Sequence, residues 1–291
     1  MDAHADARIA VAVVIVNYNA GPALADALRS LVDDTTITWD ALVVDNASRD
    51  GSIEGVEGIA PWVRVIRNRE NVGFACGVNQ GLAATTADLV LLLNPDCTIG
   101  PGATAELAGV LQQYPDCAIV GPRILDPDGS IQGSARGDPD MLTGLFGRTS
   151  ALRRLLPGAA VAKRNVVDVG AAAPGAASVV VDWLSGACML ARRSSVMRVG
   201  GFDERYFLYW EDADLCRRLR NAGMHVRYVP QAVAVHQVGR SSSTARAASI
   251  RAFHESAYLY YATHVAPGGL NPKRVIARLL LSARCWWRVR V

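Results

Sequence analysis

The stretch Ile9-Ala10-Val11-Ala12-Val13-Val14-Ile15-Val16 is an unbroken apolar run that ends at the polar residue Asn17. Because polar side chains do not alternate with the apolar ones, the run predicts a strand that is buried on both faces. Apolar residues then recur at helical spacing from Leu24 to Val32. A buried strand followed by an amphipathic helix is typical of an α/β protein.

The same alternation continues through the first half of the chain. We expect further strands at Ala41–Val44, Val63–Ile66, Leu89–Leu93 and from Ile119–Val120 onward, and helices near Ala75–Ala84 and Ala103–Gln113. This order predicts a Rossmann-like, mainly parallel sheet flanked by helices. Ligands bind such sheets at the carboxyl ends of the strands.

The second half of the chain is less regular. Gly, Pro, Ala and Arg dominate from Gly129 to Ser178, where we assign no structure and expect a variable excursion over the ligand cleft. Predicted strands return at Val179–Trp183, Ala187–Ala191, Val226–Val229 and Ala232–His236, followed by helices at about Ala245–His264 and Pro272–Val289. We therefore expect one catalytic domain at residues 1–242 and a C-terminal helical tail at residues 243–291.

Composition narrows the class of protein. The 291-residue chain carries a net charge of only +3, and no run approaches the roughly 20 apolar residues that span a bilayer. Its six cysteines include no C-x-x-C pair, which favours reduced thiols in a cytosol over a disulfide framework or a zinc site. We recognise no signal peptide. We expect a cytoplasmic protein that is soluble or bound peripherally to a membrane.

The predicted tail has a one-sided charge pattern. From Lys273 onward it carries six basic residues and no acidic one, and apolar residues that include Trp286 and Trp287 lie between them. A basic amphipathic helix with tryptophans is typical of a segment that binds a membrane surface. The alternative is a helix packed on the domain with a solvated basic face. Because the tail has no nucleic-acid docking motif, we expect no nucleic-acid partner.

A polar cluster follows each of the first four predicted strands. The clusters are Asn17-Tyr18-Asn19, Asp45-Asn46-Ala47-Ser48, Asn71-Val72-Gly73-Phe74 with Asn79 beyond it, and Asn94-Pro95-Asp96. Turn chemistry explains any one of them, but four at one edge of a sheet predict a single polar crevice. The chain lacks the G-x-G-x-x-G motif of NAD and FAD sites and the G-x-x-x-x-G-K-[ST] motif of ATP sites.

Two carboxylates in these clusters suggest how a nucleotide is held. Asp45 can accept a hydrogen bond from a pyrimidine N–H. Asp96 ends a buried strand, where a lone carboxylate is costly unless it meets a cation. A divalent ion that bridges Asp96 and a diphosphate would meet this need, because hard cations take oxygen ligands and keep substrate phosphates in their shell.

Three further carboxylates, Glu211, Asp212 and Asp214, lie within four residues just before a helical stretch. Acidic residues favour the first turn of a helix, so the cluster has a structural explanation. Carboxylates crowded at the rim of an apolar protein also indicate a general base or a metal site. Both explanations stay open when the cluster is taken alone.

Five sequence blocks stand out between about Ile9 and Gly239. They are V-V-I-V-N-Y-N, V-V-D-N-A-S-x-D-G-S, N-x-G-F-A-x-G-x-N-x-G, L-L-N-P-D and G-G-F-D-E-x-Y-F-L-Y-x-E-D-x-D-L-C. Together they resemble the family 2 inverting glycosyltransferases of GT-A fold, and look most similar to the bacterial rhamnosyltransferases that build cell-surface polysaccharides. The resemblance implies a nucleotide-sugar half at about residues 9–125 and an acceptor half at about residues 179–242.

The resemblance also implies roles for individual residues. Those implied to bind substrate are Asn17, Tyr18, Asn19, Asp45, Asn71, Gly73, Asn79, Asn94 and Trp210. Asp96 takes the last place of the family's D-x-D metal motif and His236 matches a further ligand, which implies Mg²⁺ or Mn²⁺. Asn94 stands in the first place of that motif, and this departure implies a weaker metal site.

Asp212 matches the catalytic base in the family's E-D motif. Inverting transfer is a single displacement, in which an acceptor hydroxyl attacks the anomeric carbon opposite the leaving diphosphate and needs a carboxylate to take its proton. The leaving group needs a cation or amides as its charge develops. Glu211 and Asp214 point elsewhere around the helix, so we assign Glu211 to positioning the acceptor and Asp214 to stabilising the helix.

The expected reaction moves L-rhamnose from dTDP-rhamnose to a hydroxyl of a polyprenyl-diphosphate-linked or growing cell-surface glycan, at the inner face of the cell membrane. A transferase that uses UDP-hexose or UDP-N-acetylhexosamine is the alternative within this class. An inactive GT-A domain that binds nucleotide-sugar or glycan as a scaffold is the alternative of another class, because fold alone does not settle activity.

Overall fold

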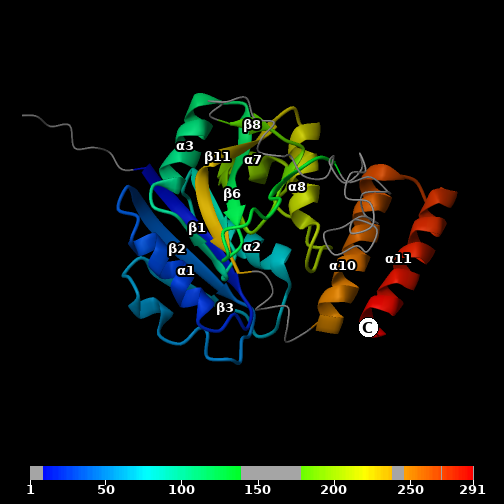
Figure 1. Ribbon diagram of the computed structural model, residues 1–291, viewed down its shortest axis with the longest axis horizontal. Coiled ribbons are helices and arrows are strands. Elements are labelled where there is room, and N and C mark those ends of the chain that lie inside the picture. The colour runs from blue at the N-terminus through cyan, green and yellow to red at the C-terminus, as the bar shows by residue number, and fades with distance from the viewer. Residues whose placement is uncertain (1–8, 139–177, 238–245, 270, 291) are drawn as a thin grey trace, which may run out of the picture.

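A twisted sheet runs through the centre of the protein, with helices on both of its faces (Figure 1). The computed structural model describes residues 9–138, 178–237, 246–269 and 271–290, and the statements below concern these residues. Val11, Val13 and Ile15 enter the apolar core on one side of the sheet, whereas Ala12 and Val14 enter the core on the other side. The first strand is therefore buried on both faces, as its unbroken apolar run predicts.

The first half follows the predicted order of strands and helices. Its elements are β1 (Ile9–Asn17), α1 (Ala23–Val32), β2 (Ile37–Asp45), the 3-10 turn η1 (Val56–Gly58), β3 (Val63–Arg67), α2 (Phe74–Ala83), β4 (Leu89–Leu93), β5 (Cys97–Ile99), α3 (Ala103–Gln113) and β6 (Cys117–Leu125). β2 begins four residues before the expected Ala41, because its first residues pair with β1 from Ile9 onward.

The second half contains more short strands than expected. Its elements are β7 (Ala135–Arg136), β8 (Val179–Val180), β9 (Trp183–Leu184), β10 (Cys188–Arg192), α7 (Arg193–Arg198), α8 (Glu211–Asn221) and β11 (His225–His236). The single strand expected at Val179–Trp183 is wrong, because β8 pairs with β11 whereas β9 pairs with β7 in a separate small sheet. The two strands expected between Val226 and His236 form one strand with an irregularity after Val229.

The order of the strands creates the predicted edge. Within the described residues, the main sheet runs β3-β2-β1-β4-β10-β6-β11-β5. β3, β2, β1 and β4 are parallel, so their carboxyl ends meet at one edge of the sheet. β10 is antiparallel to β4 and β6, and β5 is antiparallel to β11. The start of β10 and the end of β11 thereby lie at the same edge, so the second half of the chain contributes residues there.

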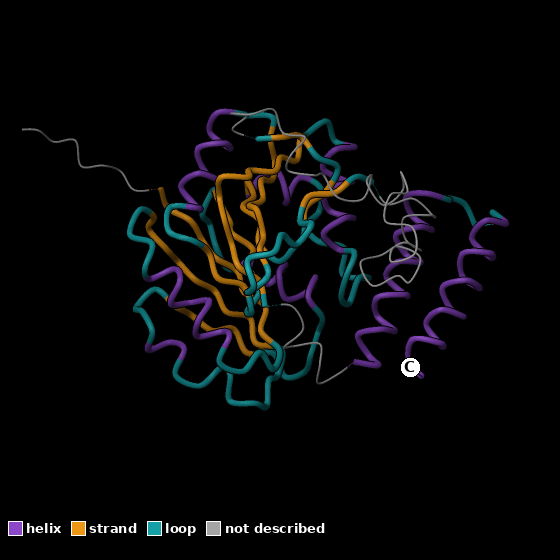
Figure 2. The backbone as a smooth tube through the Cα atoms, in the orientation of Figure 1, coloured by secondary structure: helices purple, strands orange, loops and turns teal. Residues whose placement is uncertain are grey.

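The C-terminal residues form two helices to one side of the sheet (Figure 2). α10 (Arg246–Tyr260) continues into a π-helical turn, η3 (Tyr261–Val265), and α11 (Pro272–Arg290) returns alongside α10. The expected helix start at Ala245 and residues 139–177 of the expected excursion lie outside the described residues. In the part of the chain that the structure describes, we find no helix long and apolar enough to cross a membrane.

Candidate active site

Asp45 and Asn17 lie side by side at the carboxyl edge, because β1 and β2 pair residue for residue. Nδ2 of the fully buried Asn17 lies 2.8 Å from Oδ1 of Asp45 and also contacts the hydroxyls of Ser48 and Ser52. The other oxygen of Asp45 accepts the backbone N–H of Ser48 at 3.2 Å. This network fixes Asp45, while Asn17 itself has no exposed surface through which to touch a ligand.

The loops after β1 and β2 are bonded to each other. Asn19 accepts the backbone N–H of Arg49 at 2.8 Å through Oδ1, and its own N–H donates to Oγ of Ser48 at 3.0 Å. Asn19 and Ala47 both have positive φ, at 50° and 60°. A positive φ is strained in non-glycine residues, and such residues are found more often than usual at functional sites. Tyr18 and Asn19 are both partly exposed at this edge.

Gly73 and Asn79 connect the first half of the chain to the loop before α8. Gly73 has φ of 87°, and a Cβ there would lie 2.7 Å from the carbonyl oxygen of Phe207. Asn79 exchanges two hydrogen bonds of 2.9 Å with the backbone of Phe202. Asn71 accepts the N–H of Gly73 at 2.9 Å. The hydrogen bonds of Asn79 and the close approach of Gly73 to Phe207 therefore hold α2 against the loop before α8, whereas Asn71 is bonded within the first half of the chain.

Asp96 and His236 meet at the same edge, although 140 residues separate them. β4 ends just before Asn94, and the antiparallel pairing of β5 and β11 sets His236 opposite Cys97. Nε2 of His236 lies 3.2 Å from Oδ1 of Asp96 and 3.5 Å from Nδ2 of Asn94. The structure therefore brings together Asn94 and Asp96 of the D-x-D position and His236, the further ligand that the resemblance implies.

This cluster fits a cation, although its own donors are few. In the described ranges, no group of three or more His, Cys, Asp or Glu side chains could hold one metal ion. A carboxylate suits Mg²⁺ and Mn²⁺, and substrate phosphates commonly complete such sites. Nδ1 of His236 contacts Oε1 of Gln132 at 3.1 Å, so Nε2 is the nitrogen that meets Asp96. An imidazole nitrogen and a carboxylate oxygen in direct contact need a proton or a cation between them.

Asp212 lies in the first turn of α8 and is only partly buried. Its Oδ2 accepts the N–H of Gly186 at 2.8 Å, and its Oδ1 accepts the N–H of Ala213 at 2.7 Å. Burial raises the pKa of Asp212, while these two N–H groups and the charge of Arg136 act in the opposite direction. The carboxylate is thus held in one orientation in a position where it can accept a proton.

Glu211 differs from its neighbour in being buried. Its Oε2 has no hydrogen-bond partner among the residues described. Burial, and then repulsion from Asp212, raise the pKa of Glu211 well above its ordinary value. The two adjacent acids therefore carry one negative charge more readily than two.

Two strained residues precede α8. Tyr209 and Trp210 have φ of 69° and 71°, which turns the chain abruptly into the helix that carries the acidic cluster. The indole of Trp210 packs against Phe253 and Tyr260 of α10, with ring centroids 5.8 Å and 5.4 Å away. The C-terminal helices therefore support the start of the candidate catalytic helix.

Sequence reasoning missed four residues that act on the expected site: Gly186, Arg136, Gln132 and His264. Arg136 lies in β7 and its charge acts on Asp212, whereas Gly186 follows β9 and donates its N–H to Asp212. Strands of two residues such as β7 and β9 give no periodic signal. Gln132 lies in the stretch to which we assigned no structure. His264 contacts Asp214, so Asp214 does more than stabilise its own helix.

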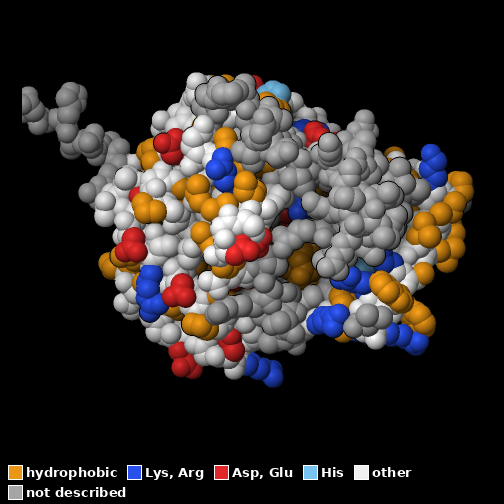
Figure 3. Space-filling view, viewed as in Figure 1, with side chains coloured by type: hydrophobic (Ala, Val, Ile, Leu, Met, Phe, Trp, Pro, Cys, Tyr) orange, Lys and Arg blue, Asp and Glu red, His pale blue; other side chains and the backbone are white. Residues whose placement is uncertain are grey.

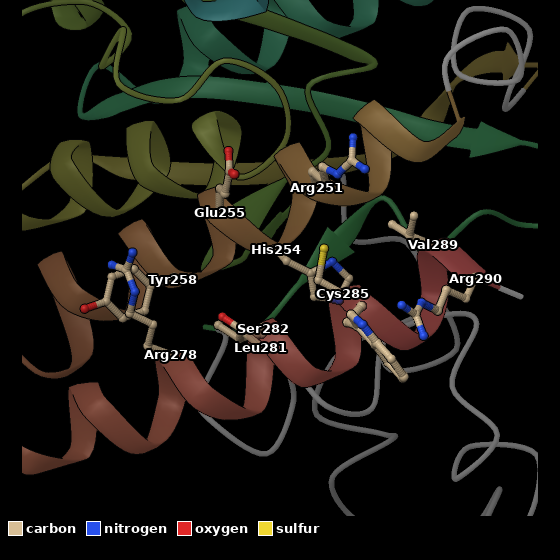
Figure 4. Close-up of a pocket in the computed structure, with 11 residues that line it drawn as sticks. Arg251, His254, Glu255, Tyr258, Arg278, Leu281, Ser282, Cys285, Val289 and Arg290 are labelled. Atoms are coloured by element: carbon tan, nitrogen blue, oxygen red, sulfur yellow. The ribbon is translucent and has the colours of Figure 1, made fainter.

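A separate hollow of about 680 Å³ lies between α10 and α11 (Figure 4). Arg251 and His254 line it from α10, and Arg278, Cys285 and Trp286 line it from α11. Nδ1 of His254 lies 2.7 Å from the carbonyl of Ile250, and burial lowers the pKa of His254. The lining thus combines apolar groups, several arginines and the carboxylate of Glu255, and the hollow belongs to the tail rather than to the carboxyl edge of the sheet.

This fold and this set of carboxylates define a GT-A glycosyltransferase. A mannosyltransferase from Pyrobaculum calidifontis in complex with GDP-Man and Mn²⁺ superposes with a TM-score of 0.58 at 17% identity, over 96% of this chain and 72% of that one. GalNAc-T7 with UDP, GalNAc and Mn²⁺ superposes with a TM-score of 0.61 at 16% identity, over 95% of this chain and 55% of that one. At such identities the likeness concerns the fold.

The chain belongs to glycosyltransferase family 2. The family model "Glycosyl transferase family 2" matches residues 12–161, and "Glycosyl transferase family group 2" matches residues 162–254. An N-acetylglucosaminyl-diphospho-decaprenol L-rhamnosyltransferase of Mycobacterium tuberculosis is 35% identical over 96% of this chain and 92% of its own length. The rhamnosyltransferase WbbL of Escherichia coli is 42% identical over 28% of this chain and 31% of its own. The protein is thus a glycosyltransferase.

Proposed function

We propose that the protein is an inverting rhamnosyltransferase that moves L-rhamnose from dTDP-rhamnose to a polyprenyl-diphosphate-linked glycan. The observation that carries this proposal is the 35% identity to the mycobacterial rhamnosyltransferase over 96% of the chain. The name of that relative specifies an acceptor on decaprenyl diphosphate, which supports a lipid-linked acceptor here.

Asp212 is the proposed base. The acceptor hydroxyl oxygen bonds to the anomeric carbon as the bond from that carbon to the diphosphate oxygen breaks. The hydroxyl proton goes to Asp212, and the bonding electrons leave with the diphosphate. The N–H groups of Gly186 and Ala213 keep the carboxylate in place for this transfer. We assign Glu211, as the buried neutral neighbour, to positioning the acceptor.

Asp96 and His236 are the proposed ligands of Mg²⁺ or Mn²⁺, with Asn94 beside them. The Mn²⁺ in two structural neighbours supports a divalent ion. Such an ion, when bound, supplies positive charge to the departing diphosphate. Because Asn94 replaces a carboxylate and lowers the negative charge of the cluster, we expect metal affinity to rise when nucleotide diphosphate is present.

The donor base and ribose are assigned to Asp45, Tyr18 and Asn19. Asn17 acts through Asp45, because its amide holds that carboxylate and has no exposed surface. Four further residues complete the substrate site: Asn71, Gly73, Asn79 and Trp210. Gly73 and Asn79 contribute by keeping the loop before α8 against α2.

The tail, residues 243–291, is the proposed membrane-binding part, and residues 1–242 are the proposed catalytic domain. Of the described residues of α11, only Ala277 is buried. Its exposed apolar side chains are Val275, Ile276, Leu279, Leu280, Trp286 and Trp287. Figure 3 shows apolar and basic side chains mixed along the edge of the molecule where α11 lies. This mixture supports peripheral binding to the cytoplasmic face of an anionic membrane.

Donor choice and turnover test the proposal together. The purified protein is screened by thermal shift against dTDP-rhamnose, UDP-hexose and UDP-N-acetylhexosamine. Release of nucleoside diphosphate is then measured with a polyprenyl-diphosphate-linked N-acetylglucosamine acceptor. We expect the largest shift and acceptor-dependent dTDP release with dTDP-rhamnose. Turnover with a UDP-sugar but not with dTDP-rhamnose would show that the proposed donor is wrong. Binding of a nucleotide-sugar without any turnover would favour the scaffold alternative.

A further inference from the structure

We propose that Asp138 is a positioning residue for the catalytic base, because it holds the small sheet of β7 and β9 against α8. This inference rests on the proposed role of Asp212 as the base. Asp138 follows β7 and is partly buried. Its carboxylate binds two arginines in the second half of α8, whereas Asp212 lies in the first turn of that helix.

Asp138 and Asp182 bind these two arginines in a closed set of charge-assisted hydrogen bonds. Nη1 of Arg217 donates to one carboxylate oxygen of Asp138, and Nη2 of Arg220 donates to the other. Nη1 of Arg220 also donates to Asp182 at 3.2 Å, and the backbone N–H of Asp138 donates to Asp182 at 2.8 Å. We call these four partly buried residues the α8 clamp. A network of this kind keeps its geometry better than an isolated surface pair does.

The two acids of the α8 clamp lie next to the two strands of the small sheet. Asp138 lies two residues after β7, and Asp182 lies directly before β9. Arg136 pairs with Trp183 across the sheet, and Asp182 donates its backbone N–H to the carbonyl of Arg136 at 3.2 Å. The indole of Trp183 donates to the carbonyl of Gly137 at 2.9 Å, and the guanidinium of Arg136 lies 5.0 Å from the centre of the ring. The α8 clamp therefore holds the small sheet as a unit.

The far end of the small sheet fixes the base. Ser185 follows β9 and donates its N–H to the carbonyl of Ser134 at 2.8 Å, which ties the next residue, Gly186, to the same sheet. Gly186 donates its N–H to Oδ2 of Asp212 at 2.8 Å, and a Cβ on Gly186 would lie 3.4 Å from the Cβ of Asp212. The charge of Arg136, in β7, acts to lower the pKa of the same carboxyl. The orientation and charge of Asp212 thus depend on where the small sheet lies.

The α8 clamp and the base lie at different heights of one helix. Arg217 and Arg220 follow Asp212 by five and eight residues, which places them about 8 Å and 12 Å farther along the axis at 1.5 Å per residue. Asp138 therefore acts on the base through the position of the small sheet. A misplacement of about 1 Å in a reacting group can cost about 10²-fold in rate. Release of the sheet should therefore slow the reaction and leave donor binding unchanged.

Asp138→Asn tests the inference, because it removes the negative charge that the two arginines share and keeps the size of the side chain. We expect kcat to fall by about 10-fold to 100-fold, while the Kd for dTDP-rhamnose, measured by calorimetry, stays within about twofold. Asp40→Asn is the matched control, because Asp40 forms a similar two-oxygen pair with Arg64 between β2 and β3. This control should turn over as the wild type does.

A clamp with a merely structural role would change the amount of folded protein and not the rate of the folded enzyme. Turnover is therefore expressed per folded protein, with the folded fraction taken from circular dichroism and urea unfolding. Arg217→Gln loosens the α8 clamp from the side of the helix, and it provides the test if Asp138→Asn does not fold. We expect it to lower kcat as well. Wild-type turnover per folded protein in either variant would overturn the inference.

A double variant shows whether Asp138 acts through the base. When Asp138→Asn is added to Asp212→Asn, the residual kcat should change by less than about twofold, because residues that act as a unit have non-additive effects. A loss as large as that in the wild-type background would overturn the inference. Wild-type turnover in Asp212→Asn would overturn the proposed base and this inference together. A loss in Asp212→Asn with none in Asp138→Asn would overturn this inference only.

Discussion

Nε2 of His264 lies 2.7 Å from Oδ1 of Asp214, and this contact joins the C-terminal helices to the helix that carries Asp212. Both side chains are almost completely buried. The other oxygen of Asp214 accepts Nε of Arg218 at 2.7 Å, one helical turn away. The π-helical turn η3 sets His264 at this position, where a regular continuation of α10 would direct the ring elsewhere. Asp214 therefore pairs with Arg218 inside α8 and also joins that helix to the tail through His264.

Removal of the His264 ring should destabilise the protein. His264→Ala leaves Asp214 buried with one partner fewer, so we expect the free energy of unfolding to fall by about 1–3 kcal/mol. Urea unfolding measures this change. His225→Ala provides the control, because its ring forms an exposed pair with Asp116 and should cost no more than about 0.5 kcal/mol. Equal effects of the two variants would contradict the anchoring role.

Loss of the Asp212 carboxylate should affect turnover and leave donor binding intact. A positioned general base contributes about 10²-fold to 10⁴-fold, so kcat of Asp212→Asn should fall within that range. The Kd for the nucleotide-sugar, measured by calorimetry, should stay within about twofold. Asp26→Asn, at an exposed residue of α1, is the matched control. A kcat close to that of the wild type would remove Asp212 as the base.

Glu211 should make stability depend on pH. Its pKa is raised in the folded protein, so the folded state keeps a proton that the unfolded chain releases above about pH 4.3. Stability therefore falls as pH rises from that value up to the raised pKa, by up to about 1.4 kcal/mol per pH unit. Glu211→Gln cannot titrate, so its advantage over the wild type should grow with pH across this window.

Urea unfolding of both proteins at several pH values measures the difference. Glu57→Gln, at an exposed residue that pairs with Arg67, should track the wild type. If the curves of Glu211→Gln and the wild type run parallel with pH, Glu211 is not held neutral by the fold.

Gly73 should tolerate no side chain. Gly73→Ala forces a Cβ to within 2.7 Å of the carbonyl of Phe207 at a φ of 87°, so we expect a loss of about 2 kcal/mol or more, with lower activity. Gly109→Ala is the opposite control, because a Cβ there meets nothing within 4 Å in the middle of α3. That variant should gain about 0.5–1 kcal/mol. Thermal unfolding measures both variants. A melting temperature of Gly73→Ala above that of Gly109→Ala would refute this account.

The exposed apolar side chains of α11 should determine membrane binding. Trp286→Ser combined with Trp287→Ser removes two half-exposed indoles, and the partition onto phosphatidylglycerol vesicles should fall by about tenfold or more. Co-sedimentation measures this partition. Val32→Ser, at an exposed apolar residue of α1, should sediment as the wild type does. If the double variant sediments with the vesicles as much as the wild type does, the proposed membrane-binding role of α11 is wrong.

The first half of the site followed from local sequence pattern. The run from Ile9 to Val16 is β-branched and has no polar alternation, and this pattern predicted a strand with both faces covered. Parallel neighbours of such a strand end at one edge, which is why polar residues at strand ends such as Asn17 and Asp45 could be expected to meet. The motif blocks then indicated family 2, and the comparisons confirmed it.

Tertiary structure decided which distant residues complete the site. His236 meets Asp96 through the antiparallel pairing of β11 with β5, and Gly186, just after the two-residue strand β9, donates its N–H to Asp212. Hydrophobic periodicity could not predict these contacts, because a strand of two or three residues is too short to show a period. Such short strands form only where other parts of the fold pack against them. The ring of His236 also contacts Gln132, which is 104 residues away along the chain. The sequence by itself determined the strands and their polar ends, and only the packing of remote segments decided how each side chain is oriented.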